Sequence, residues 1–436
     1  MKAVNIGLIG LGTVGSGTVE ILRRNNRDIS GRAGRDIQVS RIAVRDPGKA
    51  REVDIAGIPL GDDPMLVVDD PEVEIVVELV GGDTLAREVV LRAIENGKHV
   101  VTANKALIAL HGNEVFAKAQ EKGVMVAFEA AVAGGIPIIK SLREGLSANR
   151  IEWVAGIING TCNYILTRME NDGLDFSDVL RDAQALGYAE ADPAFDIEGI
   201  DAAHKLTILA SIAFGIPLQF DRVHVEGITG VSLEDIRYAG ELGYRIKHLG
   251  ITRRQHHGIE LRVHPVLIPA ERLIANVHGV MNAALIRADA VGPTLFYGAG
   301  AGAEPTGSAV VADIVDVVRA LTSDPDNRVP HLAFQPGALA RLPIMPMEDV
   351  VTAGYLRLRV VNRPGVLAAI TRIFGDRDIS IDTVLQRGHD EENGEVTIIM
   401  LTHNTRDENL AGAISEVEDL PVVIGRINLI RLENLA

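Results

Sequence analysis

Short apolar segments alternate with amphipathic ones over the first third of the chain. Residues 4–9 are apolar and mostly β-branched, and glycines follow at once, before a helical pattern at 18–24. Apolar runs of this length are typical of strands buried on both faces of a parallel sheet. Further apolar runs predict strands at 39–44, 74–80, 99–102 and 124–128, and helical spacing predicts helices at 87–95 and 113–122. Strands alternating with helices indicate βαβ units, and hence a Rossmann-like domain over residues 1–134.

The pattern changes to a mixture of helices and strands from about residue 135. Helical spacing predicts helices at 136–144, 177–186 and 200–214, and apolar runs predict strands at 150–158 and 259–267. A glycine-rich stretch at 297–302 leads into a helical segment. We therefore expect a mixed α+β catalytic and dimerisation domain over 135–302, and a helix near 303–321 that completes the first domain.

The last part of the chain has the pattern of an independent small domain. Prolines at five positions between 322 and 352 disfavour regular structure and predict a proline-rich linker over 322–350. The elements expected beyond it follow the order β-α-β-β-α-β, which is the ferredoxin-like arrangement. We expect a separable domain at 351–436, so the fold class is α/β with three domains.

Composition excludes several classes of function. The chain has 436 residues and a formal net charge of −16, which disfavours nucleic acid and anionic membranes as partners. The single cysteine, Cys162, excludes a disulfide framework within the chain and fits a reducing compartment. No apolar stretch approaches the length of a membrane span, and the first residues lack a secretory pattern. The cytoplasm is the expected location.

A dinucleotide fingerprint follows the first predicted strand. Its pattern is G-x-G-x-x-G, and its residues are Gly10, Leu11, Gly12, Thr13, Val14 and Gly15. Its position between a strand and a helix predicts a pyrophosphate site, although a glycine turn without ligand is the alternative. Arg45 stands where the second strand ends, and a guanidinium there favours a 2′-phosphate, hence NADP. NAD stays possible, because Asp46 is adjacent and Arg45 alone could be a solvated loop cation.

A second cluster carries the candidate chemistry. Five carboxylates and one lysine lie between positions 185 and 205, and Asp201 and Lys205 share one face of a predicted helix. Such a pair is often only a surface ion pair. Beside a nicotinamide, however, a lysine held by carboxylates can act on the proton of a carbonyl that receives hydride. Carboxylates such as Glu190 can bind an ammonium group, so we expect a small aldehyde or alcohol that carries an amine.

These motifs together resemble bacterial homoserine dehydrogenase, in the long form with a C-terminal ACT domain. The resemblance covers nearly the whole chain and is most specific from residue 183 to Lys205. The blocks 101–105, 129–137 and 159–164 also look like those of the family. The resemblance implies the interconversion of L-aspartate 4-semialdehyde and L-homoserine with NAD(P)H.

The resemblance also implies roles for individual residues. Lys205 would be the acid/base, with Lys105 and Asp201 beside it. Further residues would bind the substrate, namely Glu190, Gly160, Thr161 and Asp196. The fingerprint, Arg45 and a second group of residues would bind the cofactor, that group being Thr102, Lys105, Gly302 and Ala303. A plain helix entry is the alternative for residues 300–303.

Two further sites are implied by the resemblance. The family's monovalent cation, Na⁺ or K⁺, would be held by the Glu129 carboxylate and by carbonyl groups of Val132, Gly134 and Ile136; spacing alone indicates only a strand-to-helix turn. An amino-acid effector, expected to be L-threonine, would bind the turn of the ACT domain through Asn362, Arg363, Gly365 and Leu367, although some ACT domains only dimerise. A homo-oligomer, dimer or tetramer, is expected.

Alternatives of other kinds remain at this point. One is another amino-acid dehydrogenase. A semialdehyde-phosphate reductase would need a nucleophilic cysteine, and Cys162 has no histidine near it in sequence. A non-catalytic amino-acid sensor would use the nucleotide fold only as a scaffold, which the intact set of Glu190, Asp201 and Lys205 disfavours.

Overall fold

The computed structural model describes residues 2–387 and 394–435. The chain divides into two compact units. The first comprises Met1–Gly160, Asp201–Asp221 and Met281–Leu342, and the second comprises Thr161–Ile200, Arg222–Val280 and Pro343–Ala436. This division differs from the expected boundaries, because the segment expected as one catalytic domain contributes to both units. Among the described residues, no helix is long and apolar enough to cross a membrane.

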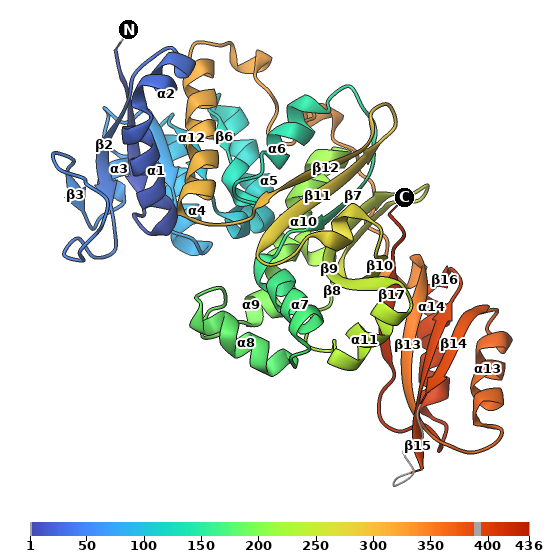
Figure 1. The fold of residues 1–436 in the computed structure, drawn as a ribbon. Helices are drawn as coiled ribbons and strands as arrows, with labels where there is room; N and C mark the ends of the chain where they lie inside the picture. The colour runs from blue at the N-terminus through green and yellow to red at the C-terminus, as the bar shows by residue number, and fades with distance from the viewer. Residues whose placement is uncertain (1, 388–393, 436) are drawn as a thin grey trace. The chain divides into compact units, whose positions relative to one another are not determined.

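A six-stranded parallel sheet forms the centre of the first unit (Figure 1). Its strand order is β3-β2-β1-β4-β5-β6, the order of the dinucleotide-binding Rossmann fold. The bounds are β1 Val4–Ile9, β2 Ile37–Ala43, β3 Leu60–Gly61, β4 Ile75–Glu78, β5 His99–Thr102 and β6 Val126–Ala127. In the ladder Ile9 is opposite Ala43 and Glu78, and Glu78 is opposite Thr102. The carboxyl ends of β1, β2, β4 and β5 therefore lie side by side along one side of the sheet.

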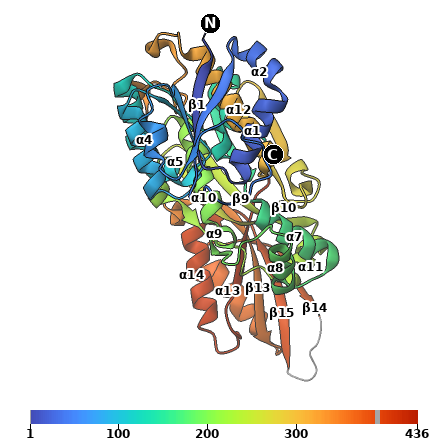
Figure 2. The same cartoon turned by 90° about the vertical axis from the view of Figure 1, so that its left-hand side faces the viewer.

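Helices cover both faces of this sheet, with α4 and α5 on one side and α1, α2 and α12 on the other (Figure 2). The bounds are α1 Thr13–Arg24, α2 Asn26–Ala33, α3 Met65–Val68, α4 Thr84–Glu95, α5 Lys105–Lys122 and α12 Ala303–Ala320. Although α12 is distant in sequence, its apolar side joins β1 and α1 in one core. A Cβ on Gly17 would lie 2.1 Å from Ala303 O, so α1 and α12 meet backbone to backbone.

The rest of the first unit comprises an antiparallel ladder and a buried helix. The ladder β7-β11-β12 comprises Ile151–Ile157, Met281–Ala288 and Gly292–Ala299. Helix α10, Ile200–Phe214, is buried along nearly its whole length, which explains why its sequence is apolar on all sides. Short elements complete the unit: η1 Glu129–Ala131, α6 Ile138–Lys140, η2 Ser141–Gly145, η3 Phe220–Arg222, η5 Pro325–Asn327 and η6 Pro336–Ala338.

The second unit joins helices to a sheet that continues into the ferredoxin-like elements. Strand β10 pairs with β9 on one side and with β17 on the other. Beyond β17 the order is β13-β15-β14, as expected for an ACT domain. The helices are α7 Gly160–Asp172, α8 Phe176–Ala185, α9 Ala194–Ile197, α11 Leu233–Glu241, α13 Val366–Asp376 and α14 Asp407–Glu418. The other elements are β8 His224–Val225, β9 Tyr244–Arg254, β10 Ile259–Pro269, η4 Leu273–Asn276, η7 Met347–Asp349, β13 Val351–Val361, β14 Ile381–Arg387, β15 Glu395–Thr402, β16 Thr405–Arg406 and β17 Asn428–Leu432.

The proline-rich segment and the C-terminal elements differ from a tether followed by a separable domain. Ala340 N donates to Gly215 O at 2.7 Å, and Ile259 N donates to Pro343 O at 2.9 Å. An apolar cluster combines α7 and α8 with side chains of the ferredoxin-like sheet, among them Tyr355. Residues 340 and 343 of the segment are therefore bonded to other parts of the chain, and the last domain shares a core with the rest of its unit.

Candidate active site

The glycine turn between β1 and α1 is closed by backbone contacts that tolerate no side chain. Gly10 has a φ of +99°, and a Cβ there would lie 2.6 Å from Leu79 O. A Cβ on Gly15 would lie 2.3 Å from Gly10 O, whereas at Gly12, the N-cap of α1, nothing lies within 4 Å of one. This tight turn with an open helix N-terminus fits a pyrophosphate bound by backbone N–H groups. The other residues of the motif lie beside it, at Leu11, Thr13 and Val14.

Two further segments lie beside this turn. Gly10 N donates to Ala43 O at 2.9 Å, and Arg45 follows Ala43 by two residues with an exposed side chain. On the other side of α1, Gly302 has a φ of +131° and forms the N-cap of α12. Ala303, the first residue of α12, contacts Gly17 of α1. The structure therefore brings Arg45 and residues 302–303 close to the first turn of α1, at the edge where the strands end.

A buried carboxylate joins two lysines in the same unit. The Asp201 Oδ2 atom lies 2.8 Å from Lys205 Nζ, and its Oδ1 atom lies 3.1 Å from Lys105 Nζ. Asn159 Nδ2 donates to Asp201 Oδ2 at 2.8 Å, and Lys205 Nζ donates to Ile158 O at 2.8 Å. The side chains of Asp201, Lys205 and Lys105 are 5%, 12% and 35% exposed. The two ammonium groups therefore point to one partly closed place.

The electrostatics of this cluster keep Asp201 ionised. Burial by itself raises the pKa of Asp201, but the charges of Lys205 and Lys105 outweigh burial and lower that pKa below its usual range. Burial also lowers the pKa of His204, the neighbouring residue on α10, to about 4. His204 packs on Phe220, with ring centroids 4.4 Å apart. A neutral imidazole beside the cluster adds no positive charge to it.

Three of the other expected substrate residues, Thr161, Glu190 and Asp196, belong to the second unit, whereas Gly160 ends the first segment of the first unit. Thr161 Oγ1 donates to Tyr188 O at 2.7 Å and lies 3.2 Å from Asp196 Oδ2, so Thr161 and Asp196 are brought together. Glu190 is exposed on the loop that leads to Asp196, and Gly160 begins α7. Cys162 is fully buried, and its Sγ donates to Asp196 O at 3.2 Å. This burial disfavours the cysteine nucleophile that a semialdehyde-phosphate reductase would need.

The block at Glu129 offers oxygen ligands around a buried carboxylate. Glu129 is 4% exposed and accepts from Ile139 N at 2.9 Å and from Lys140 N at 2.7 Å, so it caps α6. Burial raises the pKa of Glu129 to about 7. The turn that follows carries the other expected ligands, Val132, Gly134 and Ile136, and has positive φ at Ala133 and Gly134. Carboxylate and carbonyl oxygens are the type of ligand that an alkali cation takes.

The expected effector turn connects β13 to α13. Gly365 has a φ of +90° and is the N-cap of α13, and Leu367 is 36% exposed in the first turn of that helix. Asn362 N donates to Gly394 O at 2.8 Å, and Arg363 N donates to Val361 O at 3.1 Å. The four expected residues therefore lie on one turn at a helix N-terminus.

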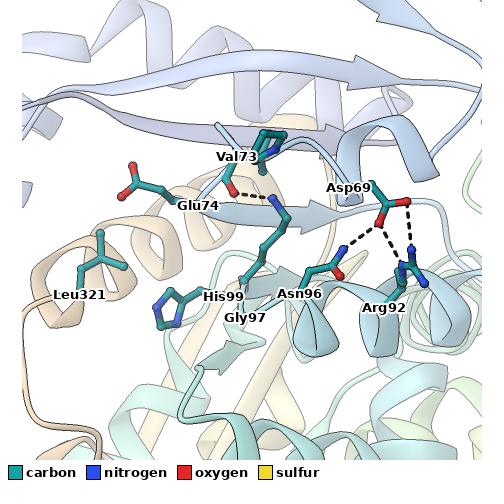
Figure 3. A pocket seen from close by; sticks show the side chains of 10 residues that line it. Asp69, Val73, Glu74, Arg92, Asn96, Gly97, His99 and Leu321 are labelled. Atoms are coloured by element: carbon teal, nitrogen blue, oxygen red, sulfur yellow. Dashed lines mark hydrogen bonds and ion pairs between the residues drawn. The ribbon is translucent and has the colours of Figure 1, made fainter.

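A large hollow of about 810 Å³ lies at the opposite edge of the Rossmann sheet (Figure 3). Val73, Glu74 and His99, which line it, mark the amino ends of β4 and β5. Asp69 pairs there with Arg92 at 3.0 Å and accepts from Asn96 at 2.7 Å. In doubly wound sheets ligands bind at the carboxyl ends of the strands, so this hollow is on the wrong edge for the nucleotide.

Comparison with known proteins decides the family. The sequence patterns of two families, described as "Homoserine dehydrogenase, NAD binding domain" and "Homoserine dehydrogenase", match residues 10–129 and 137–315, and that of the ACT domain matches 354–422. A homoserine dehydrogenase from Pseudomonas aeruginosa is 61% identical over the whole of both chains. The chain belongs to the homoserine dehydrogenase family. As such it is an NAD(P)-dependent oxidoreductase that acts on a CH–OH group.

Solved homoserine dehydrogenases have the same fold. The crystal structure from Thiobacillus denitrificans is 64% identical, has a TM-score of 0.96, and the match covers 100% of this chain and 99% of that one. A hyperthermophilic archaeal homoserine dehydrogenase mutant in complex with NADPH is 29% identical, with a TM-score of 0.63 over 75% of this chain and all of that one. These likenesses confirm the expected fold class, with its Rossmann-like, catalytic and ACT domains.

Three residues that were given no role from the sequence lie in the site or bond to one of its expected residues. Asn159 bonds Asp201, His204 lies beside it, and Glu78 ends β4. Asn159 and His204 lie in segments that resemble the family, at 159–164 and 183–205, so the signal was present. Glu78 is a single charge at the end of an apolar run, followed by Gly81 and Gly82, which indicates a shaped turn.

Proposed function

We propose that this enzyme interconverts L-aspartate 4-semialdehyde and L-homoserine, with Lys205 as the acid/base. The observation that carries the proposal is the pair of ammonium groups held on the two oxygens of Asp201. A lysine fixed by a buried carboxylate and by Ile158 O is oriented for proton transfer. The family match supports the reaction class.

The chain's own groups account for the proton and for the substrate's orientation. When bound, the nicotinamide supplies or accepts the hydride. In reduction, Lys205 Nζ gives a proton to the carbonyl oxygen, so that C=O gains one hydride and one proton and becomes CH–OH. Lys105 contacts the other oxygen of Asp201. Its positive charge stabilises the negative charge that develops on the carbonyl oxygen of the substrate. Glu190 and Asp196 bind the substrate's ammonium group, and Gly160 and Thr161 border its site.

A spectrophotometric assay of homoserine-dependent NADP reduction tests this function directly. Another amino-acid dehydrogenase would reduce NADP with a different amino alcohol or amino acid and not with homoserine. A non-catalytic sensor would bind homoserine without any change in absorbance. Either outcome would refute the proposed reaction.

We assign the preference for NADP to Arg45, whose exposed side chain stands just beyond β2. The archaeal relative was solved with NADPH, which supports a cofactor that carries a 2′-phosphate. Arg45→Asp should raise the KM for NADP by roughly tenfold or more and change the KM for NAD far less, because it replaces a phosphate partner with a repelling charge. Steady-state kinetics with both cofactors measure the effect. An equal response to both would leave Arg45 as a loop residue, and Arg27→Asp, at an exposed arginine on α2, is the control.

A monovalent cation is proposed at Glu129, with carbonyl oxygens of Val132, Gly134 and Ile136 as further ligands. It would neutralise the buried carboxylate and fix the turn between η1 and α6. Replacing Na⁺ and K⁺ with tetramethylammonium should lower the Tm of the wild type by a few degrees. Glu129→Gln should remove this salt dependence, because the amide needs no counter-ion. A Tm that responds equally in both proteins would refute the site.

A regulatory site is proposed at the turn between β13 and α13 in the second unit. We place L-threonine as the effector at residues 362–367, supported by the ACT match and by the helix N-terminus there. Titration calorimetry with L-threonine tests it.

Strand β12 is at the edge of its sheet and exposes Tyr297, which supports pairing with a second copy in a dimer or tetramer. The buried Cys162 agrees with a cytoplasmic enzyme.

A further inference from the structure

A buried carboxylate at the end of β4 bonds to Thr102, one of the residues expected to bind the cofactor. Glu78, the last residue of β4, is fully buried. Its Oε1 atom accepts from Val80 N at 2.8 Å and from Gly81 N at 3.4 Å, and its Oε2 atom accepts from Thr102 Oγ1 at 2.6 Å. The last distance is typical of a hydroxyl bound to an ionised carboxylate.

The hydrogen bonds continue from Thr102 to the helix that carries Lys105. Thr102 Oγ1 accepts from Asn104 N at 3.0 Å. The Asn104 side chain accepts from Leu107 N at 3.0 Å, which caps α5, and donates to Gly82 O at 2.6 Å. These bonds form a closed circuit. Glu78 is part of it and bonds to Gly81 on one side and to Thr102 on the other.

The circuit fixes the position of the first residue of α5. Lys105 follows Asn104 directly and contacts Asp201, which also holds Lys205. The turn at 81–82 has positive φ at both glycines, a conformation that needs outside support to be the single one adopted. The buried Glu78 carboxyl group accepts from Val80 N, Gly81 N and Thr102 Oγ1 at once, so it joins the turn to the end of β5 at a place from which water is excluded.

We propose that Glu78 is a positioning residue for the reaction, which sets the Gly81–Gly82 turn and the Lys105 end of α5 in one fixed arrangement. The inference rests on the proposed roles of Lys105 and Lys205. Burial raises the pKa of Glu78, and hydrogen bonds from four donors oppose that change, namely Thr102, Val80, Gly81 and Asn104. The fingerprint turn borders Leu79 O but also has a bond of its own, from Gly10 N to Ala43 O, which does not involve Glu78. Loss of Glu78 should therefore affect turnover more than cofactor binding.

Glu78→Gln is the direct test, because it keeps the volume and the bonds to Val80 and Gly81. Its amide nitrogen would face Thr102 as a donor, and the hydroxyl would lose its acceptor. We expect kcat to fall roughly 10- to 100-fold, as a displacement of about 1 Å does. The dissociation constant of NADPH, measured by its fluorescence, should change by less than about threefold. Thr102→Val should lower kcat similarly, and the double variant should be little worse than either single one.

The matched control is Glu74→Gln, just before the other end of the same strand, where Glu74 is half-exposed and lies 3.4 Å from Asn5 N. Its kcat should equal that of the wild type. A Glu78→Gln kcat within twofold of the wild type would overturn the proposal. So would additive losses in the double variant, or equal losses in kcat and NADPH binding together with a lower Tm, which is the signature of a merely structural role. The wild-type rate reports on the proposed function, and the ratio of variant to wild type reports on Glu78.

Discussion

Lys205→Ala is expected to abolish turnover while NADPH still binds. General acid–base groups contribute roughly 10²- to 10⁴-fold to a rate, and Lys205 is the less exposed of the two lysines on Asp201. Its removal leaves Asp201 with Lys105 and Asn159, so the local charges stay partly balanced. Steady-state kinetics with homoserine and NADP measure kcat, and the fluorescence of bound NADPH measures the dissociation constant.

The control for this variant is Lys118→Ala. Lys118 also lies on a helix of the first unit and pairs with Glu95 at 2.8 Å, but it is a surface group. Exposed ion pairs contribute about 1 kcal/mol or less, so kcat should not change. If Lys205→Ala kept more than about a tenth of the wild-type kcat, Lys205 could not be the acid/base. Lys105→Ala would then be the next variant to measure, because its ammonium group lies on the same carboxylate.

The parallel sheet could be predicted because each strand is a short apolar run next to a turn. Strand β1 agrees with its prediction at both ends, and the fingerprint turn follows it. Helix α5 begins at Lys105, well before the predicted start at 113. Residues 105–112 contain an apolar run and Gly112, which hides the helical period. Asn104 was the available signal, since asparagine is a strong N-cap residue.

The antiparallel strands were harder to predict for a different reason. Strand β9 is buried through most of its length yet contains Lys247 and His248, whose polar atoms bond within the unit. Strand β12 is half-exposed and contains glycine and proline. Neither has the alternation of a strand with one wet face. Helix α7 has the opposite difficulty, because it is buried on most sides and shows little amphipathic period.

The site was predicted only as far as local spacing reaches. Asp201 and Lys205 are four residues apart on a helix, so their 2.8 Å contact follows from helical geometry. The contact of Asp201 with Lys105 joins segments far apart in sequence, and only the family resemblance placed Lys105 at the site. Glu78 belonged to no motif, and its bond to Thr102 depends on the pairing of β4 with β5, which local spacing does not reveal.

The second large effect concerns Asp235, which connects the ferredoxin-like elements to the helices of the second unit. Asp235 is fully buried on α11 and closes a capping box with Ser232. It pairs with Arg357 at 2.7 Å and accepts from Tyr355 Oη at 3.1 Å and from Asn428 Nδ2 at 2.9 Å. Burial by itself raises the pKa of Asp235, but Arg357 and then Ser232 outweigh burial and lower it.

Asp235→Ala should destabilise the protein by about 3–5 kcal/mol, because Arg357 and the Tyr355 hydroxyl would remain buried with a principal partner gone. The Tm should fall by roughly 10 °C. The lowered pKa means that the contribution of Asp235 is complete above its unfolded pKa and is lost as pH falls through the folded value. Wild type and variant should therefore differ most near neutral pH and converge in acid.

Asp178→Ala is the matched control, since Asp178 also lies in the first turn of its helix but only pairs with Arg181 at the surface. Equal losses of Tm in the two variants would show that Asp235 acts only on its own helix and does not join the last domain to the unit. A large loss confined to Asp235→Ala would explain why the C-terminal elements, although they have a complete fold of their own, are expected to unfold together with the helices that they contact.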